Sequence, residues 1–390
     1  MDAKSGMAPM GLLKEAVRVA FLGVSRRCFQ PTLLNIHVKA AGGRLFFRGN
    51  DLETETAADI KFNGQHFEAC VSAASLSAFC SQMPADIDAK VKFSGKTLDF
   101  YCGGAECKLF SADPDSFPEQ ASFDQQGLLL SFSALVGDLR QALMVGSSCI
   151  GPSAYFCFKS MLLMADGVEH VFIGSSDGRS AVGVKIHAAE LRQGGLTIGR
   201  MKQKDAVLVP GCGVRKLASA LEAFAEDDKA FVLIDGKAAF LSVHSKQTAV
   251  FSACSLDADP SFPAQTMLKM YKYGKENLIV VDKKTLSNAL GVVSASFKDS
   301  SETDRVVLEI KKNKGFLSSS GSSCSSKAEF PLNREHGEEK CRILSASLLV
   351  RVLANLPDGE VHCCPEKNLL KFSSENNQAV FSIADIKPEA

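Results

Sequence analysis

The chain has 390 residues, of which 46% are hydrophobic and 23% charged, a globular composition that excludes disordered and fibrous proteins. At roughly 150 residues per domain, this length predicts two or three domains. The 44 basic and 44 acidic side chains cancel, so the net charge gives no support to a nucleic-acid partner. Whether the protein has a basic surface for nucleic acid depends on how the charges are distributed.

Neither a membrane span nor a metal site is predicted. No apolar run is long enough to cross a bilayer, and the first one is interrupted by Lys14, Glu15 and Arg18. The 13 cysteines include no Cys-x-x-Cys pair, and no histidine has a second histidine or cysteine at ligand spacing. We therefore expect a cytoplasmic protein with reduced, mostly buried thiols and without a metal or cofactor.

Amphipathic helices and short strands alternate along the chain. In the first helix Leu13, Val17, Phe21 and Val24 form one apolar stripe at helical spacing. The predicted helices span 11–27, 73–83, 132–146, 212–226, 283–298 and 345–356. Short strands are predicted at 44–48, 90–93, 230–234 and 306–310, and hairpin turns at 94–97, 235–237 and 366–368.

The pattern repeats three times. The segment that starts at Val71 (VSAASLSAFCSQMP) matches segments that start at Val209 and Leu344, each about a third of the chain later. Asp51 and Asp177 recur at one position of the repeat, after a strand. We expect an α+β protein of three similar domains, 1–127, 128–270 and 271–390, in which helices cover one side of antiparallel sheets.

No catalytic residue is predicted. Residues 94–97 (SGKT) lack the glycine that a phosphate-binding loop needs at position 90, and residues 146–151 (GSSCIG) miss the nucleophile-elbow spacing by one residue. Asp51 and Asp177 could be a catalytic carboxylate pair, but recurrence at equivalent positions favours turns closed by a carboxylate.

The predicted helices carry more lysine and arginine than aspartate and glutamate, whereas the rest of the chain has the opposite balance. Solvated helix faces commonly carry basic residues, and that is the alternative interpretation. A basic helix surface without base-reading chemistry favours contact with DNA phosphates. The candidate DNA-binding residues are Lys14, Arg18, Arg26, Arg27, Arg140, Arg215, Lys216, Lys283, Lys284, Lys298 and Arg351.

Over nearly its whole length the sequence resembles the bacterial sliding clamps, the β subunits of DNA polymerase III. The matching segments are 31–35 (PTLLN), 50–53 (NDLE), 116–118 (SFP), 176–179 (SDGR), 209–210 (VP) and 261–263 (SFP). The resemblance implies a DNA clamp fold and a head-to-tail homodimeric ring that encircles duplex DNA and slides. It also implies a non-enzymatic protein that a clamp loader opens and that tethers DNA polymerase and repair factors through short peptides.

By this resemblance, a peptide pocket would be formed by Gly178, Arg179, Ala181, Pro263, Met267, Leu268, Phe381 and Ile383. The sequence departs from the family here, because 179–181 read Arg-Ser-Ala instead of His-Arg-Leu and 382–386 replace the usual Met-Pro-Met ending. Ala181 would widen the pocket and favour bulkier anchors, and Ile383→Asp is expected to abolish peptide binding. The departures suit a divergent clamp, such as one carried by a phage or plasmid. The alternative is a clamp-like scaffold that binds proteins without encircling DNA.

Overall fold

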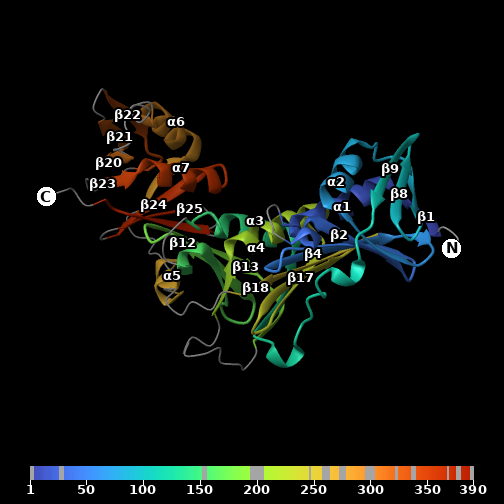
Figure 1. Cartoon of the computed structure of the whole chain (residues 1–390). Helices are drawn as coiled ribbons and strands as arrows, with labels where there is room; N and C mark the ends of the chain where they lie inside the picture. Colours follow the sequence, from blue (N-terminus) through green and yellow to red (C-terminus); the bar gives the residue numbers. More distant parts are fainter. Residues whose placement is uncertain are drawn as a thin grey trace. The chain divides into compact units, whose positions relative to one another are not determined.

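The computed structural model (Figure 1) describes residues 4–25, 30–151, 156–193, 206–245, 247–256, 264–271, 278–294, 304–320, 324–334, 340–366, 369–374 and 379–386. They form two compact units. The first comprises residues 1–143, 164–171 and 187–258, and the second residues 144–163, 172–186 and 259–390. The predicted division into three domains at 127/128 and 270/271 stays a prediction. None of the described helices is long and apolar enough to cross a membrane.

The order of elements recurs in each third of the chain. A strand and a helix are followed by three strands, with one additional strand in each of the first two copies, and then a second strand and helix are followed by three more strands. The first copy comprises β1 (Lys4–Pro9), α1 (Met10–Gly23), β2 (Asn35–Ala41), β3 (Arg44–Asn50), β4 (Thr54–Lys61), β5 (Asn63–Gly64), β6 (Phe67–Ser72), α2 (Ala73–Gln82), β7 (Asp88–Phe93), β8 (Thr97–Cys102) and β9 (Ala105–Phe110).

The second copy comprises β10 (Leu130–Leu135), α3 (Val136–Gly146), β11 (Ser160–Ala165), β12 (His170–Ser176), β13 (Ser180–His187), β14 (Ala189–Gln193), β15 (Ala206–Pro210), α4 (Gly211–Ala220), β16 (Lys229–Ile234), β17 (Ala238–His244) and β18 (Thr248–Ser255). After α5 (Ala264–Tyr271), the third copy comprises β19 (Ile279–Asp282), α6 (Lys283–Ser294), β20 (Arg305–Lys311), β21 (Lys314–Ser320), β22 (Ser325–Pro331), β23 (Lys340–Ser345), α7 (Ala346–Asn355), β24 (Glu360–Glu366), β25 (Leu369–Ser374) and β26 (Ala379–Ala384). The predicted threefold repeat is confirmed.

Two sheets form the first unit, and strands from different copies of the repeat meet in one of them. The smaller sheet has the order β5-β1-β7-β8-β9, with β9 at its edge. The larger has the order β14-β10-β16-β17-β18-β4-β3-β2-β6. Its centre is the antiparallel pair β18–β4, which joins the last strand of the second copy to a strand of the first.

The second unit repeats this arrangement. Seven consecutive strands of one eight-stranded sheet have the order β11-β12-β13-β26-β25-β24-β19, and the antiparallel pair β13–β26 joins the second copy to the last strand of the third. The other sheet has the order β22-β21-β20-β23, with β22 at one edge. These antiparallel sheets with helices on them confirm the predicted α+β class.

Helix α1 shows how a helix is seated on a sheet. The helix lies on β3 and β4 (Figure 1). Leu13 and Val17 of its apolar stripe are buried. A Cβ on Gly49 would lie only 2.0 Å from the carbonyl oxygen of Ala20, so glycine is required for the helix to approach the strand. The helix ends at Gly23, whose Cβ position is equally obstructed by Gly49.

The structure corrects several predicted helix boundaries. The helix predicted at 11–27 ends at residue 23, and the one predicted at 132–146 begins only at Val136, because residues 130–135 form β10 between β14 and β16. The helix predicted at 212–226 ends at Ala220 and continues as a 3-10 turn, Leu221–Ala223. In the helix predicted at 283–298, the described residues are helical to Ser294.

Candidate functional site

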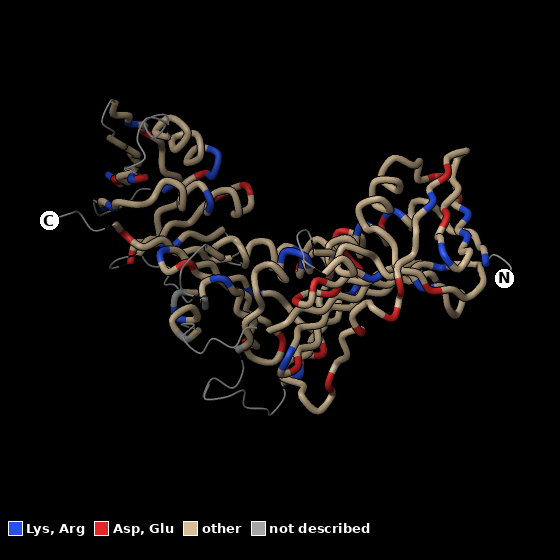
Figure 2. The backbone as a smooth tube through the Cα atoms, viewed as in Figure 1, with Lys and Arg blue, Asp and Glu red and all other residues tan. Residues whose placement is uncertain are grey.

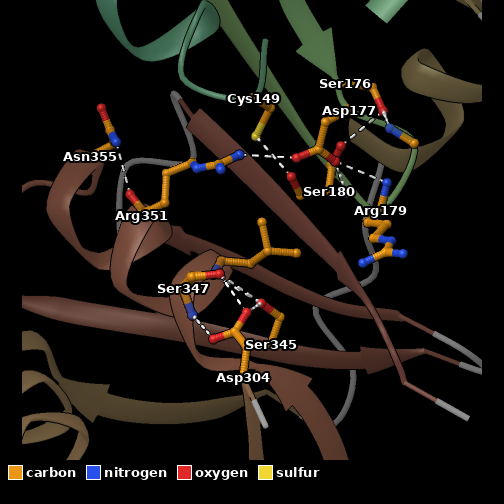
Figure 3. Close-up of polar contacts among 12 residues, drawn as sticks. Cys149, Ser176, Asp177, Arg179, Ser180, Asp304, Ser345, Ser347, Arg351 and Asn355 are labelled. Atoms are coloured by element: carbon orange, nitrogen blue, oxygen red, sulfur yellow. Dashed lines mark hydrogen bonds and ion pairs between the residues drawn. The ribbon is translucent and has the colours of Figure 1, made fainter. Parts of the chain in front are cut away.

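A cavity of about 580 Å³ lies in the second unit, where the turn between β12 and β13, the start of α7 and the segment after β26 meet (Figure 3). Apolar groups and charged groups share its wall. The lining residues are Asp177, Arg179, Asp304, Arg305, Ser345, Ser347, Leu348, Ala384, Asp385 and Ile386.

The β12–β13 turn is built around Asp177. Its Oδ1 accepts hydrogen bonds from the backbone N–H groups of Arg179 (2.9 Å) and Ser180 (2.6 Å), and the Arg351 guanidinium donates to its Oδ2 at 3.0 Å (Figure 3). Gly178 takes the positive φ of +86° that the turn requires. The turn is thus fixed on both sides, and it holds the exposed Arg179 at the cavity.

The thiol of Cys149 lies next to this turn and is buried. Ser180 Oγ donates to Cys149 Sγ at 3.5 Å, and burial raises the pKa of the Cys149 thiol to about 11. At neutral pH it is therefore protonated and a poor nucleophile.

The second wall is the start of α7. Asp304 Oδ1 accepts a hydrogen bond from the backbone N–H of Ser347 at 2.8 Å (Figure 3). Asp304 Oδ2 accepts a second one from the Ser347 hydroxyl at 2.6 Å. Ser345 caps the helix by accepting from the backbone N–H of Leu348. These contacts place the Leu348 side chain in the cavity wall, where it supplies apolar surface.

The third wall is the segment that follows β26. The Ala384 N–H donates to the Arg179 carbonyl at 2.9 Å and the Ile386 N–H to the Ile343 carbonyl at 2.8 Å. Asp385 forms an ion pair with Arg342 at 2.6 Å. Its Oδ1 is buried and has no hydrogen-bond partner among the described residues. A buried acceptor of this kind can accept an N–H group from a bound molecule.

Eight of the eleven cations predicted to bind DNA lie within the described residues, and all eight are on helices. Five are paired within the described residues, and Lys14 instead bonds to the Met83 carbonyl. The five pairs are Arg18 with Glu15 and Glu222, Arg140 with Glu226, Lys216 with Asp51, Lys283 with Asp358, and Arg351 with Asp177. Basic and acidic residues accordingly lie interspersed along the chain (Figure 2). Arg215 and Lys284 are exposed, while Arg26, Arg27 and Lys298 lie outside the described residues.

Comparison with known proteins identifies the fold. The sequence matches no protein-family model and no curated protein. The structure of the sliding clamp (DNA polymerase III subunit beta) from Pseudomonas aeruginosa bound to griselimycin is similar with a TM-score of 0.84 at 17% identity, covering 99% of this chain and 100% of that one. The chain has the DNA clamp fold.

Sliding clamps from other bacteria agree. The clamp from Bartonella birtlesii has a TM-score of 0.82 at 16% identity, covering 99% of this chain and 100% of its own. The beta clamp from Helicobacter pylori has a TM-score of 0.80 at 14% identity, covering 98% and 100%. The similarity to the bacterial sliding clamps, inferred from short motifs, therefore extends over the whole clamp fold at low sequence identity.

Two of the residues that the sequence assigned to a peptide pocket lie at the cavity. Arg179 lines it, and Gly178 forms the adjoining turn. Ala181, Phe381 and Ile383 are 5%, 0% and 0% exposed, so their side chains belong to the core around β13 and β26 and leave little surface for a ligand. A buried charge at position 383 would destabilise the sheet itself, so Ile383→Asp does not isolate peptide binding.

The remaining assigned residues lie on or before α5. Met267 is 3% exposed and packs against Gly174 of β12, Leu268 is half-buried, and Pro263 lies outside the described residues. The sequence analysis missed Asp304, Ser345, Leu348 and Ile386. The Ser-Ala-Ser sequence at 345–347 was a usable signal, because serines at a helix start commonly cap it.

Within the described residues, no group of three or more His, Cys, Asp or Glu side chains could hold a metal ion. Eleven of the cysteines in the described residues are free, and seven of these are buried, which agrees with the expectation of mostly buried thiols.

Proposed function

We propose that the chain is a sliding clamp, a non-catalytic processivity factor that closes head to tail with a second copy around duplex DNA. In this role it tethers DNA polymerase and other replication or repair factors through short peptides and is opened by a clamp loader. We also propose that the protein is located in the cytoplasm.

The proposed ring is supported by the way in which strands from different copies of the repeat pair. The last strand of the second copy pairs with β4 of the first copy, and the last strand of the third copy pairs with β13 of the second. By the same rule β9, the last strand of the first copy, would pair with β22 of the third. Both are edge strands in their own sheets, so each has a free edge. We propose that β9 of one copy of the chain pairs with β22 of a second copy.

Affinity for DNA would come from helix cations acting on phosphates without sequence preference. Arg215 on α4 and Lys284 on α6 are exposed and are the best placed of the described candidates. The cations already paired with carboxylates contribute less, since their charge is partly neutralised before any phosphate approaches. A modest, salt-sensitive affinity is therefore expected, with ring closure providing the retention.

The test of this function uses DNA topology. Clamps loaded or trapped on nicked circular DNA should remain through a high-salt wash and should dissociate once the circle is linearised. Arg215→Ala and Lys284→Ala should each reduce the salt slope of direct DNA binding by at most about one. Equal loss from circular and linear DNA would overturn encirclement.

That last outcome would favour the second candidate, a clamp-like scaffold that binds proteins without encircling DNA. The observation in its favour is that five helix cations are paired with carboxylates, which lowers the positive potential available for phosphates.

The cavity of the second unit is proposed as the site for partner peptides. Leu348 and Ile386 offer apolar surface for an anchoring side chain, and the unpartnered Oδ1 of Asp385 suits a peptide N–H. Ile386→Asp should weaken binding of polymerase-derived peptides by about tenfold or more, because few contacts usually carry most of the binding energy. Val350→Asp is the matched control, since Val350 is an exposed apolar residue of α7 that does not line the cavity. Unchanged affinity in Ile386→Asp, measured by fluorescence polarisation, would place the pocket elsewhere.

A further inference from the structure

The two edge strands β9 and β22 carry alternating charges that can decide how they pair. Glu106 and Lys108 are exposed on β9, and Lys327 and Glu329 are exposed on β22. We propose that β9 of one copy pairs antiparallel with β22 of a second copy in the register that places Glu106 directly opposite Lys327. This inference rests on the proposed ring and adds the residue pairing that selects the partner edge.

The first step aligns β9 with the strand that already makes such a junction. In the hairpins β8–β9 and β17–β18, the first residue of the earlier strand faces the last residue of the later one. Ser255 at the end of β18 therefore corresponds to Phe110 at the end of β9. Counting back equally, Phe251 corresponds to Glu106.

The second step aligns β22 with β4. The hairpins β3–β4 and β21–β22 pair in the same way, first residue with last residue. Lys61 at the end of β4 therefore corresponds to Pro331 at the end of β22, and Ala57 corresponds to Lys327. Across the β18–β4 junction Phe251 faces Ala57. Transferred to the free edges, this register puts Glu106 opposite Lys327.

The junction between β13 and β26 gives the same answer independently. In the hairpin β25–β26, the first residue of β25 faces Ala384, the last residue of β26, so Val380 corresponds to Glu106. On the other strand, the turns closed by Asp51 and Asp177 are equivalent, so Gly183 corresponds to Ala57. Val380 faces Gly183. Both internal junctions therefore share one register.

The charges disfavour the neighbouring alternative. A slip of two residues, which keeps exposed side chains on one face, would set Glu106 against Glu329 and Lys108 against Lys327. Like charges directly opposite each other destabilise a strand pair, whereas opposite charges stabilise it. A slip of one residue would set these exposed side chains opposite half-buried ones.

The two side chains are available for this contact. Glu106 and Lys327 form no ion pair among the described residues, whereas Glu329 is already paired with Lys314 at 2.5 Å. The Lys327 ammonium lies 4.8 Å from the centroid of the Phe316 ring, which holds it at the edge strand. Glu106 lies opposite Tyr101 on β8 and accepts a hydrogen bond from the Tyr101 hydroxyl, which leaves its negative charge without a cationic partner among the described residues.

Cross-linking tests the register directly. In a Cys107→Ser, Cys324→Ser background, the chain with Glu106→Cys and Lys327→Cys should form covalent closed dimers on mild oxidation. Two matched controls, Glu106→Cys with Glu329→Cys and Glu106→Cys with Ser325→Cys, place the thiols diagonally and should cross-link several-fold more slowly.

Charge reversal gives a second readout in the native cysteine background. Glu106→Lys should raise the dimer dissociation constant roughly 3- to 30-fold, since the ring contains the junction twice. Adding Lys327→Glu to the same chain should restore the parent value within about threefold. Absence of restoration would overturn the Glu106–Lys327 pairing.

The remaining outcomes separate this inference from the proposed function. Preferred cross-linking of a control pair in a dimer overturns the register and leaves the ring. A dimer in which none of the three pairs cross-links overturns pairing through these edges. A parent protein that stays monomeric at all concentrations overturns the ring, and the inference with it.

Discussion

Asp51 and Asp177 show how one side chain serves two purposes at equivalent places in the repeat. One carboxylate oxygen of each closes the turn after a strand, as the sequence predicts. The other oxygen binds a helix cation, Lys216 for Asp51 and Arg351 for Asp177. Each aspartate therefore ties a strand end to a helix, and two candidate DNA-binding cations are committed within the protein.

The two roles of Asp177 can be separated by substitution. Asp177→Asn keeps an oxygen that can close the turn but loses the charge, so it should cost no more than about 1 kcal/mol of unfolding free energy. Asp177→Ala loses both and should cost roughly 1–2 kcal/mol more. Urea denaturation of both variants measures the difference. Equal losses would mean that the turn contributes nothing beyond the ion pair.

At the scale of elements, close approach of backbones decides where helices sit and end. The helix α1 can lie on β3 only because Gly49 and Gly23 have no Cβ. A hydrophobic stripe predicts that such a helix is covered, but the residue that lets it approach lies on another element. The helix predicted to reach residue 27 ends at Gly23, and Val24 after it is extended.

Glycine substitutions test this packing. Gly49→Ala would place a methyl group 2.0 Å from the Ala20 carbonyl oxygen and should destabilise the first unit by about 2 kcal/mol or more. Gly291→Ala is the matched control, because Gly291 is an exposed position of α6 with no atom near its Cβ, and alanine there should stabilise by about 0.5–1 kcal/mol. Thermal unfolding of the two variants should shift in opposite directions.

At the scale of the whole molecule, the strand-pairing rule leaves β9 and β22 for a second copy. Phe110, the last residue of β9, is 80% exposed at this free edge, so its apolar surface is accessible to a partner strand. In the proposed ring it lies at the junction between two copies.

Assembly can therefore be tested at Phe110. Phe110→Asp should shift the protein from dimer to monomer, with an increase of roughly tenfold or more in the dimer dissociation constant, because apolar contact is lost at both junctions. Val168→Asp, an equally exposed position at the β11–β12 turn, should leave the mass unchanged. Native mass spectrometry or light scattering distinguishes the two, and dimerisation unaffected by Phe110→Asp would argue against this edge.

The sequence by itself determined the threefold repeat, the class of fold and the positions of hairpin turns and amphipathic helices. These features depend on residues close together in the chain, such as the stripe of Leu13 and Val17 or the turn at Asp177. Periodicity and turn chemistry express such local preferences directly. The short motifs of the clamp family were sufficient to indicate the fold.

Only the tertiary structure decided which strands join different copies of the repeat, which helix cations meet a carboxylate and which residues face the cavity. Phe381 and Ile383 illustrate the reason, because the family resemblance gave them to a pocket and packing buries both completely. Contacts such as Arg351 with Asp177, or β18 with β4, join residues far apart in the chain. The residues around each partner in the sequence do not indicate which distant residue it will contact. Such contacts therefore form only when the sheets assemble.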